Sequence, residues 1–275
     1  MQIIDLFSGI GGFSLAGDWM GWKTICFCEI DKLCTKVLNN HWSGVPVFDD
    51  IYTLTYEKIK NETRYDPSEP TIIVGGFPCQ PFSNAGKRKG TADNRYLWPE
   101  MLRVISEVKP QWVIGENVAG LLSMDDGKVF DRILSDLEAE GYEVEPYLIP
   151  ACGVGAWHRR NRVWITAHSR LQRPTKHEKQ TARTEQYSED VPNTNNQRLQ
   201  GSQKTGDTES QGTKCDEQPA GCYQSGEYWA TEPNVGRVAH GVPNRVDRLK
   251  SLGNAIVPQI AFQLFSAINK VMEIK

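Results

Sequence analysis

One cysteine between two prolines is the residue of this chain best suited to covalent chemistry. Cys79 follows a β-branched apolar run and two glycines, and Pro78 and Pro81 restrict the backbone around it. A thiol on a stiff loop at the end of a buried strand stands where a nucleophile is needed. Most free cysteines are only small buried hydrophobic residues. The run Pro78-Cys79-Gln80-Pro81 nevertheless favours the nucleophile.

Two other loops carry groups that would assist such a nucleophile. Glu116 comes directly after an apolar run, and it is either a solvated loop acid or, beside a nucleophile, a general acid. Arg160 and Arg162 stand at the start of a strand, where alternation would place both on one face. Arginine forks bind carbonyl and phosphate oxygens, although surface arginines are also common at strand edges.

A glycine-rich loop near the N-terminus indicates a cofactor site. Residues 5–14 place glycines between an expected strand and an expected helix, so that a ligand can approach the backbone. Glu29 follows Gly9 by twenty residues and ends the second strand, where a carboxylate can accept hydrogen bonds from ribose hydroxyls. The third glycine of a dinucleotide fingerprint is replaced by Ser14, and a tight turn with a solvated glutamate remains the alternative.

These loops are separated by alternating strand and helix patterns. Apolar β-branched runs predict strands at 3–7, 24–28, 71–74, 112–114, 144–149 and 163–167. Helical patterns begin near residue 13 and span 32–40, 98–108 and 129–140. A final amphipathic helix carries Ile260, Leu264, Ile268 and Val271 and should pack back on the sheet. Such alternation predicts an α/β fold with a doubly wound, mostly parallel sheet, whose ligands bind at the carboxyl ends of the strands.

Composition divides the 275-residue chain into a core and a polar insert. Of residues 168–227 only nine are hydrophobic, which leaves little to bury. We therefore expect a catalytic domain from 1–167 plus 250–275, and a small polar region over 168–249. Although the net charge is −3, eight Lys or Arg between 159 and 183 form a local basic strip that can grip phosphates.

Cysteine use and hydropathy favour the cytoplasm. Seven cysteines without a Cys-x-x-Cys pair fit a reducing compartment, and neither a signal peptide nor an apolar run of membrane-spanning length is visible. The spacing of Cys215, Cys222 and His240 matches no standard zinc finger, so no metal is expected.

The order of the motifs resembles the DNA cytosine-5 methyltransferase family, especially its compact phage and bacterial members. The resemblance covers the chain outside the polar insert. It rests on Asp5–Gly12, Glu29, Asp50, Gly75–Ser83, Glu116-Asn117-Val118, Arg160 with Arg162, and Arg245–Asn254. It implies a Rossmann-like fold that uses S-adenosyl-L-methionine, with 168–249 as a target-recognition region. His158 departs from the family, which usually has Gln there.

The implied activity is methyl transfer from S-adenosyl-L-methionine to C5 of a flipped-out cytosine in a specific duplex DNA sequence. By this resemblance Cys79 adds to C6, Glu116 protonates N3, Arg162 pairs with O2, and Arg160 steadies the base and the Cys79 loop. The cofactor residues would be Asp5, Phe7, Ser8, Gly9, Gly11, Gly12, Glu29, Asp50, Ile51, Pro78, Asn254 and Ala255. The DNA-binding residues would be Gln80, Ser83, Lys87, Arg88, Lys89, Arg245 and Arg248.

Three other functions stay open at this point: tRNA cytosine-5 methylation on the same fold, a nicotinamide-dependent oxidoreductase, and a non-catalytic DNA-binding module. The expected partner is double-stranded DNA, with no membrane association. A cognate restriction endonuclease would be a functional partner and not a stable subunit. We expect a monomer in the cytoplasm of a bacterium or of a phage-infected host cell.

Overall fold

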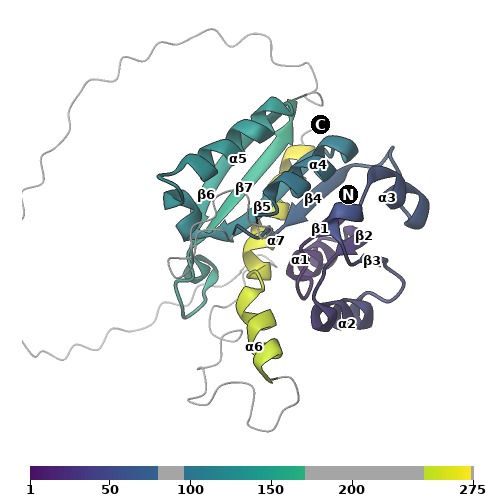
Figure 1. Cartoon of the computed structure of the whole chain (residues 1–275), viewed down its shortest axis with the longest axis horizontal. Coiled ribbons are helices and arrows are strands. Elements are labelled where there is room, and N and C mark those ends of the chain that lie inside the picture. Colours follow the sequence, from purple (N-terminus) through teal and green to yellow (C-terminus); the bar gives the residue numbers. More distant parts are fainter. Residues whose placement is uncertain (80–95, 171–244, 274–275) are drawn as a thin grey trace, which may run out of the picture. The chain divides into compact units, whose positions relative to one another are not determined.

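A seven-stranded sheet forms the centre of the computed structural model, which describes residues 1–79, 96–170 and 245–273 (Figure 1). The strand order is β3-β2-β1-β4-β5-β7-β6. The strands are β1 Gln2–Leu6, β2 Lys23–Cys28, β3 Val47–Phe48, β4 Thr71–Gly75, β5 Trp112–Val118, β6 Tyr142–Ile149 and β7 Arg162–Ser169. β7 pairs antiparallel with both β5 and β6, while the pairs from β3 to β5 are parallel. The mostly parallel, doubly wound sheet is therefore confirmed.

Seven α-helices accompany the sheet within the described residues. They are α1 Gly12–Trp19, α2 Lys32–His41, α3 Tyr56–Glu62, α4 Trp98–Val108, α5 Lys128–Ala139, α6 Arg245–Asn254 and α7 Pro258–Glu273. Local sequence fixes several of their starts. Asp31 accepts hydrogen bonds from two backbone N–H groups of the first turn of α2, and Thr55 caps α3 in the same way.

The two faces of the sheet are covered by different helices. Along β1, Ile4 points into the cluster that contains Met101 of α4 and Ile133 of α5. Its neighbour Ile3 points into the opposite cluster, with Phe13 of α1 and Phe265 of α7. This alternation is the period-two geometry of a strand that is buried on both faces.

The final helix packs on the sheet as its pattern predicts. Ile260, Ala261, Phe265 and Ile268 are buried in the second cluster, whereas Val271, expected on the same face, is 49% exposed. The stretch Lys250–Glu273 is the one described helical segment long and apolar enough to cross a membrane. One such segment is weak evidence for a membrane span, and its buried residues, Ile260, Ala261, Phe265 and Ile268, pack in the second cluster.

The segment before α7 forms a separate helix. Gly253 and Asn254 are the last residues of this helix, α6. The break falls at 255–257, directly before Pro258, because proline disfavours helical backbone in the residue that precedes it. The boundaries of the 168–249 region remain a prediction, since most of that region lies outside the described residues.

Candidate active site

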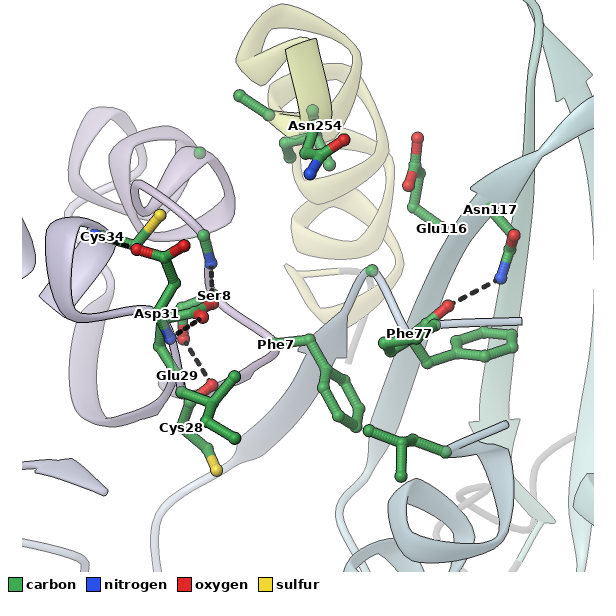
Figure 2. Close-up of a pocket in the computed structure, with 18 of the residues that line it drawn as sticks. Phe7, Ser8, Cys28, Glu29, Asp31, Cys34, Phe77, Glu116, Asn117 and Asn254 are labelled. Carbon is green, nitrogen blue, oxygen red and sulfur yellow. Dashed lines mark hydrogen bonds between the residues drawn. The ribbon is translucent and has the colours of Figure 1, made fainter. Parts of the chain in front are cut away.

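The loops that carry the predicted chemistry meet at one edge of the sheet. β1 lies between β2 and β4, with Leu6 beside Gly75, so the strand order reverses where the loops after β1 and β4 leave the sheet. Ligands of doubly wound sheets bind at such switch points. A cavity of about 840 Å³ opens there between the two loops, and Figure 2 shows residues that line it.

One half of this cavity presents two oriented carboxylates. The Glu29 carboxylate accepts hydrogen bonds from the backbone N–H groups of Gly9 and Asp31, both at 2.7 Å. An oxygen of Asp50 accepts from the N–H of Tyr52 at 2.9 Å. Each carboxylate retains lone pairs for a ligand. Ten of the expected cofactor residues line the cavity: Phe7, Ser8, Gly9, Gly12, Glu29, Asp50, Ile51, Pro78, Asn254 and Ala255.

The charge of the cavity favours a cationic nucleoside over a dinucleotide. Its acidic lining residues are Glu29, Asp31, Asp49, Asp50 and Glu116, whereas its basic ones are Arg162 and Lys250. A pyrophosphate would be repelled by this excess of carboxylates, while a sulfonium would be attracted. The carboxylates also match the hydroxyl and amine donors of an adenosyl group. The residues present therefore fit S-adenosyl-L-methionine.

Two of the expected cofactor residues lie behind the cavity wall. Asp5 is fully buried and accepts a hydrogen bond from Ser14 Oγ at 2.7 Å, while burial raises the pKa of its carboxyl to about 8. At Gly11 the φ angle is 85°, and an added Cβ would lie 2.5 Å from the Trp42 ring. Neither residue lines the cavity. In the structure these two residues contact Ser14 and approach Trp42, and their role in cofactor binding stays a prediction.

The candidate nucleophile is held by a side chain that the sequence did not single out. Asn117 Nδ2 donates to Cys79 Sγ and to the Phe77 carbonyl, both at 2.9 Å; Figure 2 shows the second bond. Cys79 also forms a backbone bridge with Tyr96, and Leu97 N–H donates to the Pro78 carbonyl. Burial raises the pKa of the Cys79 thiol to about 12, and the Asn117 hydrogen bond opposes that rise. The resting group is a thiol.

The candidate acid is paired with an arginine from β7. Arg162 Nε lies 3.0 Å from Glu116 Oε1. This contact depends on the direction of β7. Because β7 runs antiparallel to β5, its first residue, Arg162, pairs with Val118, the last residue of β5. Burial raises the pKa of Glu116 to about 7, although Arg162 and Arg160 act to lower it. Glu116 can therefore hold or release a proton near neutral pH.

Arg160 does not share a strand face with Arg162 as expected. It precedes β7 with a φ of 35°, so the alternation of a strand does not apply to it. Its Nη2 donates to the carbonyls of Gly253 and Ala255, at 2.8 and 2.6 Å. Arg160 thus braces the C-terminal wall of the cavity and has no contact with the Cys79 loop among the hydrogen bonds of the described residues.

Several predicted residues lie outside the described structure. Gln80, Ser83, Lys87, Arg88 and Lys89 belong to the segment 80–95. Arg245 and Arg248 are described only by their backbone in α6. The possible zinc ligands Cys215, Cys222 and His240 are also outside, and the described residues contain no cluster of three or more metal-ligating side chains.

Known proteins resemble this chain over about three fifths of its length. The type II methyltransferase M.AquIA of Picosynechococcus is 33% identical over 177 residues, which are 61% of this chain and 71% of that protein. M1.ScrFI of Lactococcus lactis is 36% identical over 62% of this chain and 42% of its own length. The matched region is therefore less than half of the length of M1.ScrFI.

A solved structure of a putative DNA modification methyltransferase encoded within an Escherichia coli prophage has a TM-score of 0.50 and 26% identity, covering 62% of this chain and 47% of that one. A Spodoptera frugiperda DNMT2 structure, at 23% identity and the same TM-score, supports the fold alone. The profile of C-5 cytosine-specific DNA methylases matches residues 1–230. The chain therefore belongs to the C-5 cytosine-specific DNA methylase family, the DNA cytosine-5 methyltransferases that use S-adenosyl-L-methionine.

Proposed function

We propose that this chain transfers a methyl group from S-adenosyl-L-methionine to C5 of a flipped-out cytosine in duplex DNA. One observation supports this most strongly: of two consecutive residues of β5, one is the candidate acid and the other binds the candidate nucleophile. Asn117 binds the Cys79 thiol, and Glu116 is paired with Arg162. A nucleophile, an acid and a fixed cation therefore face one cavity, as covalent activation of a pyrimidine requires.

The adenosyl side of the cavity would hold the methyl donor. Glu29 would accept from the ribose hydroxyls and Asp50 from the adenine amine, while Asn254 and Ala255 close the C-terminal wall. When bound, S-adenosyl-L-methionine supplies an electrophilic methyl group for C5 and leaves as S-adenosylhomocysteine. The protein's task is to make C5 nucleophilic.

The chain's own residues would do this in two coupled steps. Cys79 Sγ loses its proton to solvent and bonds to C6, while the Glu116 proton passes to N3, so the C5–C6 electron pair becomes available at C5. After methylation a base removes the C5 proton. As the electron pair of that C–H bond re-forms the C5–C6 double bond, the S–C6 bond breaks and its electron pair leaves on Cys79 as thiolate, while the N3 proton returns to Glu116. Arg162 would pair with O2 of the base.

The cellular setting is part of the proposal. The relatives are bacterial type II methyltransferases, which supports the bacterial or phage-infected cytoplasm as the location and a cognate restriction endonuclease as a functional, non-permanent partner. We propose a monomer, because all the reactive groups discussed above come from one chain. The region 168–249 is proposed to read the target sequence.

Labelled methyl transfer tests the function. Methyl-labelled S-adenosyl-L-methionine is incubated with unmethylated genomic DNA or with tRNA, and 5-methylcytosine is quantified in each. We expect label in DNA only, complete loss with Cys79→Ala, and retained DNA binding by that variant. Cys152→Ala is the matched control, because Cys152 is an exposed cysteine outside the cavity. Label in tRNA alone, or a methylating Cys79→Ala variant, would refute the proposal.

A further inference from the structure

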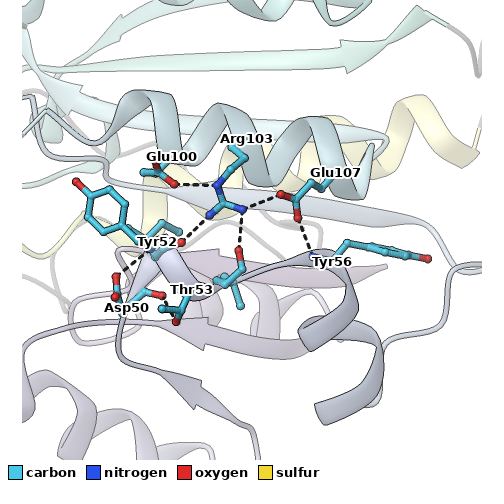
Figure 3. A network of polar contacts seen from close by, with 9 residues as sticks. Asp50, Tyr52, Thr53, Tyr56, Glu100, Arg103 and Glu107 are labelled. Carbon is cyan, nitrogen blue, oxygen red and sulfur yellow. Dashed lines mark hydrogen bonds and ion pairs between the residues drawn. The ribbon is translucent and has the colours of Figure 1, made fainter.

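Arg103 of α4 connects two elements through an unusually complete set of hydrogen bonds. Its Nε and Nη1 pair with Glu100 and Glu107 on its own helix, both at 2.8 Å. Nη1 also donates to the Leu54 carbonyl at 2.9 Å, and Nη2 donates to the Ile51 carbonyl at 2.7 Å. Figure 3 shows this network. Four of the five guanidinium donors are therefore satisfied by protein.

The two carbonyls belong to the segment that forms the Asp50 side of the cavity. Ile51–Thr53 is a short 3-10 helix, and Asp50 caps it through the N–H of Tyr52. Asp50, Ile51 and Tyr52 line the cavity. Because the carbonyls of Ile51 and Leu54 flank this turn, Arg103 holds both of its ends.

Glu107 extends the same clamp to the next helix. While one of its oxygens pairs with Arg103, the other accepts a hydrogen bond from the N–H of Tyr56, the first residue of α3, at 2.9 Å. The whole connection from Asp50 to α3 is thus tied to two residues of α4 that lie one helical turn apart.

The turn also has hydrogen bonds of its own. Its two backbone bonds, Thr53 N–H to the Asp50 carbonyl and Leu54 N–H to the Ile51 carbonyl, are long at 3.2 and 3.3 Å, while the Asp50 side chain and the Thr53 hydroxyl add bonds of 2.9 and 3.1 Å. The bonds from Arg103 are shorter than the two backbone bonds and carry a full charge, so they are the stronger restraints. An exposed helix ion pair alone would contribute little. In this network, however, the two glutamates orient the fork of Arg103 toward the carbonyls.

We propose that Arg103 is a positioning residue for the adenine side of the methyl-donor pocket. It acts through the Ile51–Thr53 turn, and so fixes where the Asp50 carboxylate meets the adenine amine. This inference rests on the proposed function, because it requires an adenosyl ligand in the cavity. It predicts that Arg103 affects donor binding and leaves the methyl-transfer step unchanged.

The test compares Arg103→Gln and Arg103→Lys with the wild type and with Arg132→Gln. Arg132 of α5 is a suitable control, because it also pairs with a carboxylate at i+4, Asp136, but is 72% exposed. Calorimetry measures binding of S-adenosylhomocysteine and of 5′-methylthioadenosine, which shares the adenosyl group but lacks the amino-acid part. Steady-state kinetics gives kcat and the KM values for S-adenosyl-L-methionine and DNA.

We expect Arg103→Gln to weaken both ligands by the same factor of about ten, which corresponds to about 1.4 kcal/mol. Arg103→Lys should lie between it and the wild type, because lysine keeps the charge and loses the fork. The KM for S-adenosyl-L-methionine should rise in parallel, with kcat and the KM for DNA unchanged. Arg132→Gln should bind like the wild type.

The outcomes separate this inference from the proposed function. If the wild type binds neither ligand, the proposed function fails. If the wild type binds both and Arg103→Gln binds them equally well, the role of Arg103 is refuted. It is also refuted if binding of 5′-methylthioadenosine alone is unaffected, or if kcat falls while donor affinity is unchanged. Should Arg103→Gln fail to fold, wild-type affinity of a folded Arg103→Lys for both ligands overturns the inference.

Discussion

Replacement of Asn117 by alanine should impair both stability and the covalent step. The substitution removes the donors to Cys79 Sγ and to the Phe77 carbonyl, and also the acceptor for the N–H of Val118. Phe77 is buried, so its carbonyl would lose its partner away from water. Loss of a hydrogen bond costs about 1 kcal/mol of stability, and a buried polar group left without a partner costs about 1–3 kcal/mol. We therefore expect a loss of unfolding free energy of about 3 kcal/mol.

The chemical consequence follows from the charge on sulfur. A hydrogen bond to a charged group contributes about 1.5–3 kcal/mol, and the Asn117 amide would stabilise the Cys79 thiolate more than the thiol. Loss of this bond should slow formation of the S–C6 bond by about 10- to 100-fold. The assay is single-turnover trapping of the enzyme on DNA with 5-fluorocytosine at the target, beside urea unfolding.

Two further variants test whether the effect comes from the hydrogen bond that Asn117 donates to Cys79. Asn117→Asp keeps the acceptor for Val118 but places a carboxylate beside the sulfur, so it should trap more slowly than Asn117→Ala. Asn269→Ala removes an exposed amide from α7 and should change stability by less than about 0.5 kcal/mol. If Asn117→Ala forms the adduct within twofold of the wild-type rate, Asn117 does not support the nucleophile.

Two other predictions concern stability. Folding raises the pKa of Glu116 from 4.5 to about 7. The stability that this group contributes is therefore complete below pH 4.5 and is lost as the pH rises through 7. The free energy of unfolding should fall by about 3 kcal/mol across this range. Urea unfolding at pH 4.5 and 8 should show this loss in the wild type, and Glu116→Gln should lack it; equal pH dependence would contradict the shift. Gly11→Ala should lose about 2–4 kcal/mol, from a positive φ and a clash with Trp42, whereas Gly21→Ala, also at positive φ but with open space, should lose about 1 kcal/mol. Equal losses in urea unfolding would show that Trp42 does not require the glycine.

The strands and the order of the loops could be predicted because burial on both faces leaves a strong local pattern. Ile72, Ile73 and Val74 are fully buried, and an apolar β-branched run of that length between turn residues has few other uses. The direction of β7 has no such local signal, since alternation is the same in both directions. The pairing of Arg162 with Glu116 depends on that direction.

The roles of residues that position other parts of the site through long-range hydrogen bonds were the hardest to predict. Asn117 was part of a recognised motif, but its two donors reach partners about forty positions earlier, which spacing does not encode. Arg103 resembled an ordinary solvated helix residue, because its glutamate partners lie at i−3 and i+4 while its carbonyl partners are about fifty residues away. Arg160 adopts a left-handed backbone that alternation could not anticipate.

The position of α7 in the core has a consequence for synthesis on the ribosome. Phe13 and Trp164 need Phe265 to complete their cluster, and about a hundred residues must be translated between Trp164 and Phe265. At about 5–20 residues per second, the apolar face of the nascent sheet stays uncovered for roughly 5–20 s. During that interval the growing chain exposes apolar side chains that the finished protein buries, which makes it prone to aggregation.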